Sequence, residues 1–279
     1  MSGTLYIVAT PIGNLEDLTP RACQTLANVS LIAAEDTRHT GRLLMHIACK
    51  TRLLPLHDHN EERVVGGLIA MLKDGDSIAL VSDAGTPLIS DPGFRLVREA
   101  HRNDIQVSPI VGASAVTAAL SSSGIATDRF CFEGFLPPKE NARRDALGKL
   151  ANETRTLVFY ESVHRIADCM NDMVAAFGAD RQAFIGRELT KMHEQCVQET
   201  LATIKQQVDS GEIVAKGEFV IVVSGNDMQP ESDLDDDQLL LELAAYLPAK
   251  DVAKVAARLL GKKKNALYER LLQLKATNT

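Results

Sequence analysis

Short apolar runs alternate with amphipathic, helix-like stretches along residues 1–122. Such runs are typical of strands that are buried on both faces of a parallel sheet. They predict strands at Leu5–Ala9, Leu31–Ala34, Ser77–Val81 and Gln106–Ile110. The helical patterns between them begin at Pro20 behind a capping Thr19, after a capping Asn60, at Phe94 and at Ala113. This alternation predicts a doubly wound α/β domain over residues 1–122.

The pattern continues over residues 123–227 and predicts a second α/β domain. Strands are expected at Phe130–Glu133, Leu157–Tyr160, Ala183–Arg187 and Phe219–Val223, and helices at Asn141–Leu150, Val163–Phe177 and Leu201–Val208. Residues 228–279 begin with a polar, acidic linker, Met228–Asp237, followed by helical patterns at Gln238–Tyr246, Ala249–Leu260 and Asn265–Leu274. The last two are joined at Gly261 with helix-turn-helix spacing, which serves either nucleic-acid docking or packing alone.

The segment Ser77–Gly93 combines a buried strand with an unusual loop. Its apolar run leads into a loop rich in glycine, proline and hydroxyl residues that also carries Asp83 and Asp91. Ligands of open parallel sheets bind beyond the carboxyl ends of the strands, where this loop is expected. The alternative is a long surface connection, although loops longer than roughly 12 residues are usually functional or disordered. Three further unusual loops follow predicted strands, at Thr10–Asp17, Glu35–Thr40 and Val111–Ser114.

The formal net charge of −7 hides a strong asymmetry in the C-terminal region. Residues 227–242 hold seven acidic and no basic residues, whereas residues 246–279 hold eight basic and two acidic ones. A basic tail on an acidic body favours a nucleic-acid contact, although solvated helix faces also produce such runs. The five cysteines are scattered and form no CxxC pair, which predicts reduced thiols in a cytoplasmic protein. No transmembrane helix and no metal site are predicted.

Several well-known site motifs are missing from the sequence. It lacks the GxGxxG fingerprint after the first strand, a P-loop, a GxSxG elbow and an HExxH pair. It does contain, in this order, ATPIGNLEDLT, EDTRHT, SDAGTPLISDPG, PIVGASAV, FEGFLPPK, FYESVHRI and KGEFVIVV. This ordered set resembles the tetrapyrrole-methylase superfamily, whose members use S-adenosylmethionine. Within it, the chain is most similar to the branch of small-subunit ribosomal RNA methyltransferases.

The resemblance implies two α/β domains of the class III methyltransferase type and a small helical, helix-turn-helix-like region at the C-terminus. It also implies 2′-O-methylation of a cytidine ribose in the decoding centre of 16S rRNA, with the rRNA or the small ribosomal subunit as partner, and a homodimer. Two alternatives stay open: methylation of a tetrapyrrole or corrin precursor, and a non-catalytic nucleic-acid-binding protein that senses S-adenosylmethionine.

The family pattern also implies cofactor-binding positions. Small residues there let the backbone approach a ligand closely, and Asp83 suits a positive charge or ribose hydroxyls unless it only caps a turn. The Gly and Pro of the family's GDP loop are replaced on either side of Asp83, which disfavours a tetrapyrrole substrate more than the cofactor. The expected cofactor-binding residues are Pro11, Gly13, Ser82, Asp83, Ala84, Gly85, Ser114, Ala115 and Tyr160.

A ribose hydroxyl is a poor nucleophile, so a base or a nearby cation would help its methylation. The catalytic candidates are Glu35, Asp36, Glu161 and Arg187, drawn from a wider set at strand ends that includes Arg38, Glu133, Glu188 and Lys191. Adjacent residues of an extended chain point in opposite directions, so at most one of Glu35 and Asp36 is expected to face the cleft. Arg187 and Glu188 could instead form a structural ion pair.

Two groups of basic residues are expected to contact RNA. Lys139, Arg143 and Arg144 lie at the start of a predicted helix, where their charge opposes the helix dipole, so a phosphate contact is a sensible explanation. Lys262, Lys263 and Lys264 lie at the turn between the last two helices, where lysines also stabilise a helix C-terminus.

Overall fold

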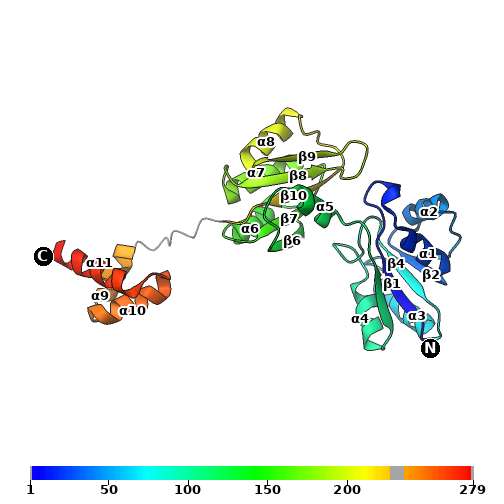
Figure 1. Cartoon of the computed structure of the whole chain (residues 1–279), viewed down its shortest axis with the longest axis horizontal. Helices are drawn as coiled ribbons and strands as arrows, with labels where there is room; N and C mark the ends of the chain where they lie inside the picture. The colour runs from blue at the N-terminus through cyan, green and yellow to red at the C-terminus, as the bar shows by residue number, and fades with distance from the viewer. Residues whose placement is uncertain (1, 227–235, 278–279) are drawn as a thin grey trace. The chain divides into compact units, whose positions relative to one another are not determined.

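The computed structural model describes residues 2–226 and 236–277. The chain forms two compact units, Met1–Gly225 and Asn226–Thr279 (Figure 1). The predicted acidic linker lies outside the described residues, apart from Asp236 and Asp237, which begin a helix. No helix in the described ranges is both long and apolar enough to cross a membrane.

The first sheet of unit 1 is entirely parallel, as its apolar runs predict. Its strand order is β3-β2-β4-β1-β5. All residues of β2 and β4 are buried, which explains why these central strands carry unbroken apolar runs. The strands are β1 (Thr4–Val8), β2 (Leu31–Ala34), β3 (Leu53–Pro55), β4 (Ile78–Val81) and β5 (Gln106–Ile110).

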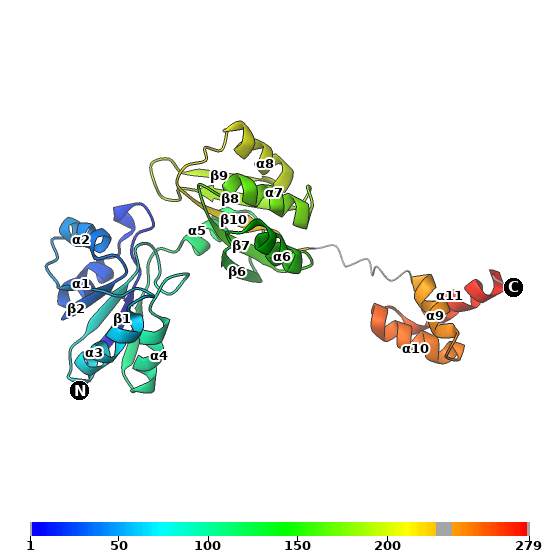
Figure 2. The same ribbon diagram turned by 180° about the vertical axis from the view of Figure 1, so that it is seen from behind.

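Helices cover both faces of this sheet (Figure 2). On one face, Leu26 of α1 and Leu44 of α2 pack with Ile32 of the sheet. On the other face, α3 and α4 pack against the alternate residues of the same strands, including Leu5 and Leu80. The bounds are Pro20–Asn28 for α1, Thr37–His46 for α2, Glu61–Lys73 for α3 and Phe94–Arg102 for α4.

The second sheet of unit 1 is mixed, with the order β6-β7-β10-β8-β9. Only β6 and β7 pair in parallel in this sheet as described; the other neighbours pair antiparallel. Helices α6, α7 and α8 cover one face. The strands are β6 (Phe130–Phe135), β7 (Thr156–Ser162), β8 (Gln182–Arg187), β9 (Gln195–Thr200) and β10 (Glu218–Val223), and the helices are α6 (Glu140–Leu150), α7 (Ile166–Phe177) and α8 (Leu201–Ser210).

The opposite face of the second sheet is covered by α5 (Ala115–Ser122), which follows the last strand of the first sheet. Its apolar residues Ala119 and Leu120 pack with Phe184 and Val222. The predicted boundary between domains 1–122 and 123–227 therefore assigns to the first domain a helix that packs on the second sheet. We retain two domains as a proposal.

Loops join the two halves of unit 1. Ile12, just after β1, belongs to the same apolar cluster as Leu189, just after β8. The N–H of Asn14 donates to Oγ1 of Thr190 at 3.2 Å. A short 3-10 helix, η1 (Leu15–Asp17), follows in the β1 loop. These contacts bring the loop after β1 against the loop after β8, and the candidate site lies in this region.

The described residues 236–277 of unit 2 form three helices, α9 (Asp236–Ala244), α10 (Ala249–Leu260) and α11 (Lys264–Thr277). Its small core consists of Leu240, Val252, Ala256, Leu267 and Leu271. Gly261 ends α10 in a left-handed conformation, with φ of 65°, which a glycine adopts without a Cβ clash. The tail therefore has the predicted helices and turn.

Four features differ from the sequence prediction. The segment Glu35–Thr40 is not a loop throughout, because Asp36 caps α2 through bonds from the N–H groups of Arg38 and His39. The strands β3 and β9 are additional, and both are edge strands with few buried residues, so they lack a continuous apolar run. Asn60 precedes α3 without capping it, since its side chain bonds His57 and Pro55 instead.

Candidate functional site

A pocket of about 430 Å³ lies between the carboxyl-end loops of the first sheet and the second sheet. This volume is within the usual range for small-molecule sites. We call it the central pocket. Its lining from the first half includes Glu35, Asp83–Gly85, Asp91, Ser114 and Ala115, and its lining from the second half includes Phe135, Tyr160, Glu161, Glu218 and Val220.

The loop after β4 is fastened to the loop after β1. Thr10 and Gly85 exchange two backbone hydrogen bonds, of 2.9 and 3.0 Å. Gly85 has φ of +77°, and a Cβ there would lie 3.2 Å from Cγ2 of Ile12. Leu88 and Ser90, further along the loop, also have positive φ. Such strained positions persist where the surroundings hold them, and they cluster at binding sites.

Three carboxylates give the central pocket a negative field. Asp83 is oriented by the N–H of Asp36, which donates to its Oδ1 at 3.1 Å. Burial raises the pKa of Asp91 to about 6, and repulsion from the nearby Glu35 and Asp83 adds to the rise. A hydrogen bond from Ser82 lowers this pKa but does not offset the burial. Burial and repulsion from Asp83 also raise the pKa of Glu35. A positively charged ligand would relieve this repulsion, so the pocket favours a cation.

An aromatic wall faces these carboxylates. The rings of Phe135 and Tyr160 meet edge to face with centroids 5.5 Å apart, and Phe132 meets Tyr160 at 4.9 Å. Burial raises the pKa of Tyr160 to about 12, so its phenol stays neutral. A flat, neutral aromatic surface beside small residues suits a planar ligand group such as a nucleobase.

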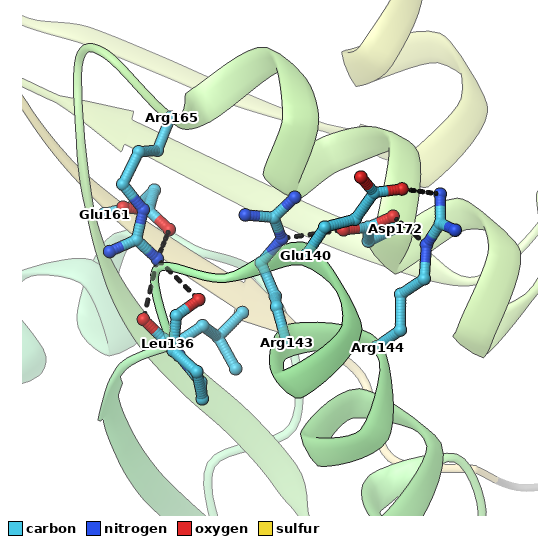
Figure 3. A network of polar contacts seen from close by, with 8 residues as sticks. Leu136, Glu140, Arg143, Arg144, Glu161, Arg165 and Asp172 are labelled. Atoms are coloured by element: carbon cyan, nitrogen blue, oxygen red, sulfur yellow. Dashed lines mark hydrogen bonds and ion pairs between the residues drawn. The ribbon is translucent and has the colours of Figure 1, made fainter.

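Glu161 lines the central pocket but is already engaged (Figure 3). Its side chain is fully buried, and its Oε2 accepts a bond of 3.1 Å from Nη2 of Arg165. The same Nη2 donates to the carbonyl oxygens of Leu136 at 2.6 Å and Pro137 at 3.3 Å. The pair therefore holds the loop after β6 beside the pocket, and Glu161 is better placed to position this wall than to accept a proton.

A second pocket of about 330 Å³ adjoins the central one. We call it the adjacent pocket. It shares Ile12, Asp83, Ala84 and Glu218 with the central pocket, which makes these residues the boundary between the two. The rest of its lining includes basic side chains, namely His39, Arg42 and Lys191.

The structure divides the expected cofactor-binding residues between the two pockets. The central pocket brings together Asp83, Ala84, Gly85, Ser114, Ala115 and Tyr160. The adjacent pocket holds Pro11, Gly13 and Ser82. The sequence prediction did not select Asp91, Phe135 or Glu218. Asp91 lies in SDAGTPLISDPG, Phe135 in FEGFLPPK and Glu218 in KGEFVIVV, but no sequence pattern indicates that these residues line one pocket.

Two further catalytic candidates, Asp36 and Arg187, are also engaged in structural contacts. Asp36 caps α2 and pairs with Arg38 at 2.9 Å, and the hydrogen bonds from Arg38 hold its pKa well below the usual range. Arg187 is buried and donates to the carbonyl oxygens of Lys216 at 2.6 Å and His193 at 2.9 Å. The suggested ion pair between Arg187 and Glu188 is replaced by a different pair, because Glu188 pairs with Lys191. Glu35 keeps its place in the central pocket.

The basic residues at the start of α6 also differ from expectation. Arg143 is only 4% exposed, and its Nε donates to Oδ2 of Asp172 at 2.7 Å (Figure 3). Arg144 donates to the other oxygen of Asp172 at 2.7 Å and pairs with Glu140. The prediction of a phosphate contact is therefore wrong for Arg143, because a buried carboxylate from α7 compensates its charge.

Four other residues that the sequence predicts to contact RNA are exposed. Lys139 is exposed ahead of α6, and Lys263 and Lys264 are exposed at the turn between α10 and α11. Lys262 is exposed as well but pairs with Asp236. Their role in RNA binding stays a prediction.

Two family profiles match the chain. The family described as Tetrapyrrole (Corrin/Porphyrin) Methylases matches residues 4–205, and the family described as RsmI C-terminal HTH domain matches residues 230–275. Curated proteins named Ribosomal RNA small subunit methyltransferase I are similar over almost the full length. The one from Haemophilus influenzae is 50% identical, covering 96% of both chains. The one from Escherichia coli O157:H7 is 51% identical, covering 97% of this chain and 95% of the relative.

Solved structures support the fold of unit 1. A diphthine synthase covers 80% of this chain and 90% of its own, with a TM-score of 0.58 and 14% identity. A uroporphyrin-III-C-methyltransferase from Thermus thermophilus covers 80% of this chain and 94% of its own, with a TM-score of 0.56 and 18% identity. At these identities the likeness concerns the fold alone. With the family profile and the curated relatives, it shows that the chain belongs to the tetrapyrrole methylase family, in the group of ribosomal RNA small subunit methyltransferase I.

Proposed function

We propose that this chain is an S-adenosylmethionine-dependent methyltransferase that modifies a cytidine ribose at its 2′ oxygen in the decoding centre of 16S rRNA. Relatives with about 50% sequence identity are named as methyltransferases of the small-subunit ribosomal RNA, which supports this RNA as the substrate. The observation that carries the proposal is the pairing of two unlike pockets, one acidic and aromatic, the other lined by basic side chains.

The central pocket fits S-adenosylmethionine. The cofactor carries a sulfonium and an ammonium, which suit Asp83 and Asp91, and an adenine, which suits the wall of Phe135 and Tyr160. The close backbone at Gly85 leaves no room for a Cβ without a shift of Ile12. When bound, the cofactor supplies an activated methyl group on sulfur.

The chain itself contributes orientation and the exclusion of water. Ile12, Phe219 and Val220 give the central pocket an apolar lining near the shared boundary. Substrates that cover this boundary when they bind exclude water from it, which strengthens the carboxylate field and protects the reacting atoms. Methyl transfer is an in-line displacement, so holding the acceptor in line can supply a large part of the rate enhancement.

The helical unit supports RNA as the acceptor over a tetrapyrrole. Its profile is that of a helix-turn-helix domain, and a small tetrapyrrole needs no such unit. We propose that it docks on the ribosomal subunit through exposed lysines at its turn, such as Lys263 and Lys264. A cytoplasmic location follows from this substrate, and a homodimer remains a proposal from the family likeness.

Methyl transfer from labelled cofactor tests the proposal directly. Purified full-length protein is offered naked 16S rRNA, small ribosomal subunits and a tetrapyrrole, and the nucleosides are then analysed by mass spectrometry. We expect label only in the RNA or the subunit, as a 2′-O-methylated cytidine. Label on a base, or only on the tetrapyrrole, refutes the assignment; cofactor binding without transfer favours the non-catalytic alternative.

A further inference from the structure

The loop between β8 and β9 holds a partly buried lysine in an unusual backbone. Glu188 and Thr190, on either side of Leu189, have φ of 50° and 65°. Residues other than glycine rarely adopt such values, and they persist only where the surroundings fix them. Here they direct the next residue, Lys191, into the lining of the adjacent pocket.

Lys191 bridges two carboxylates. Its Nζ lies 2.8 Å from Oε1 of Glu188 and 3.1 Å from Oε2 of Glu218. Oε1 of Glu188 also accepts the N–H of Glu218 at 3.0 Å. The Glu188 side chain is 18% exposed and the Glu218 side chain is 76% exposed. Glu188 is therefore largely buried and holds the lysine in place, whereas the Glu218 side chain is mostly exposed to solvent where it lines the pockets.

Two glycines make room for this cluster. A Cβ on Gly13 would lie 2.2 Å from Cγ of Lys191, and a Cβ on Gly217 would lie 2.3 Å from Cδ of Glu188. Both distances are far below van der Waals contact, so any larger residue would displace the side chain it meets. The close approach at Gly13 also fixes the lysine stem against the loop after β1, which lines the adjacent pocket as well.

The position of the cluster connects it with the reaction. Glu218 lines both pockets, and Lys191 lines the adjacent one. If the cofactor occupies the central pocket, an acceptor reaches the shared boundary from the adjacent pocket. There the basic side chains of His39 and Arg42 suit the phosphates of a nucleotide. Of the residues at the boundary, Glu218 and Asp83 carry carboxylates, and Asp83 already accepts the N–H of Asp36.

We propose that Glu218 is the catalytic base for the acceptor hydroxyl and that Lys191 orients its carboxylate. This inference rests on the proposed function. In the step, the oxygen–methyl bond forms while the sulfur–methyl bond of the donor breaks, and the hydroxyl proton passes to Oε1 of Glu218. The neutral carboxyl group then releases this proton to water. In the described part of the chain, the one side chain bonded to the carboxylate of Glu218 is Lys191, through Oε2.

Lys191 is suited to orientation and not to accepting the proton itself. Burial lowers its pKa, but the bonds to Glu188 and Glu218 outweigh burial, so its pKa is raised. It therefore remains an ammonium at neutral pH. A fixed positive charge beside the base also stabilises negative charge that develops on the acceptor oxygen.

The test compares Glu218→Gln with the wild type in single-turnover methyl transfer to small ribosomal subunits at saturating cofactor. We expect a fall in rate of at least 100-fold, within the range for loss of general base catalysis. Cofactor affinity by calorimetry and subunit binding by filter retention should stay within threefold.

Glu199→Gln is the matched control, because Glu199 is an exposed carboxylate on β9 of the same sheet. It should leave the rate unchanged. Lys191→Met should lower the rate at least tenfold, with partial recovery in Lys191→Arg. Thermal melting of each variant checks that it folds.

A Glu218→Gln protein with a rate within threefold of the wild type overturns the inference. So does one whose entire defect is weaker cofactor or subunit binding. If the wild type transfers no methyl group to the subunit or its RNA, the proposed function fails, and the inference fails with it. Wild-type transfer with a fast Glu218→Gln variant leaves the function standing and refutes only the base.

Discussion

Replacing Asp172 by Asn should destabilise unit 1 strongly. Its side chain is 3% exposed, and its Oδ2 accepts a hydrogen bond of 2.7 Å from Nε of Arg143. The Arg143 side chain is itself 5% exposed. Breaking a buried pair by removing one charge costs about 3–5 kcal/mol, because the other charge stays buried without compensation. We expect about 3 kcal/mol, since the amide oxygen of Asn still accepts a hydrogen bond. The pair with Arg144 adds little, because that arginine is 57% exposed.

This loss corresponds to a fall in melting temperature of about 6–12 °C for a unit of this size. The chain contains no tryptophan, so circular dichroism and scanning calorimetry are the appropriate measurements. Asp145→Asn, which alters an exposed carboxylate on α6, is the control and should have almost no effect. The double variant Arg143→Met with Asp172→Leu should recover most of the stability, because apolar residues often replace a buried ion pair at little cost.

The effect should depend on pH with a definite sign. Burial raises the pKa of Asp172, but the bonds from Arg144 and Arg143 outweigh burial, so its pKa in the fold is lowered. A carboxylate with a lowered pKa stabilises the fold above its unfolded value of about 3.9 and loses that stabilisation as pH falls. The gap between wild type and Asp172→Asn should therefore narrow between pH 5 and pH 3. A loss below about 1 kcal/mol at pH 7, or a gap that does not narrow, refutes this account of the pair.

Three further predictions concern the pockets and the tail. Asp83→Ala or Ser114→Trp should weaken S-adenosylmethionine binding at least tenfold in calorimetry, about 1.4 kcal/mol, and unchanged affinity in both folded variants would place the cofactor elsewhere. Because burial raises the pKa of Asp91 to about 6, cofactor affinity should fall as pH drops through that value, and Asp91→Asn should bind weakly with no such fall. Truncation after Asn226 should leave cofactor affinity intact while weakening subunit binding and flattening its salt dependence; an unchanged salt slope would make the tail purely structural.

The sequence predicts the fold well where burial is continuous. The strands β2 and β4 and the helix α4 lie at their predicted positions, because buried strands and amphipathic helices leave periodic patterns. The sequence of the edge strand β9 alternates only weakly between apolar and polar residues, so it does not predict a strand. The mixed directions of the second sheet also leave no local pattern, since pairing joins residues far apart in the chain.

The candidate site was predictable only as far as its loops. The small residues at Gly85, Ser114 and Ala115 mark a close backbone approach, and the family likeness supports them. The roles of Arg143 and Glu218 depend instead on partners about 30 residues away, Asp172 and Lys191. A charged residue that is buried and paired has the same letter as one that projects into a pocket, so sequence reasoning could not separate the two.

The packing of α5 has a consequence for how the chain is made on the ribosome. The helix leaves the ribosome with the first half, yet its apolar face is covered by β8 and β10. About 100 residues separate the end of α5 from the end of β10. At usual synthesis rates the face therefore stays uncovered for about 5–20 s. During that interval Val116 and Leu120 form an exposed apolar surface on the nascent chain. Chaperones would bind this surface, and a stalled fragment would aggregate through it.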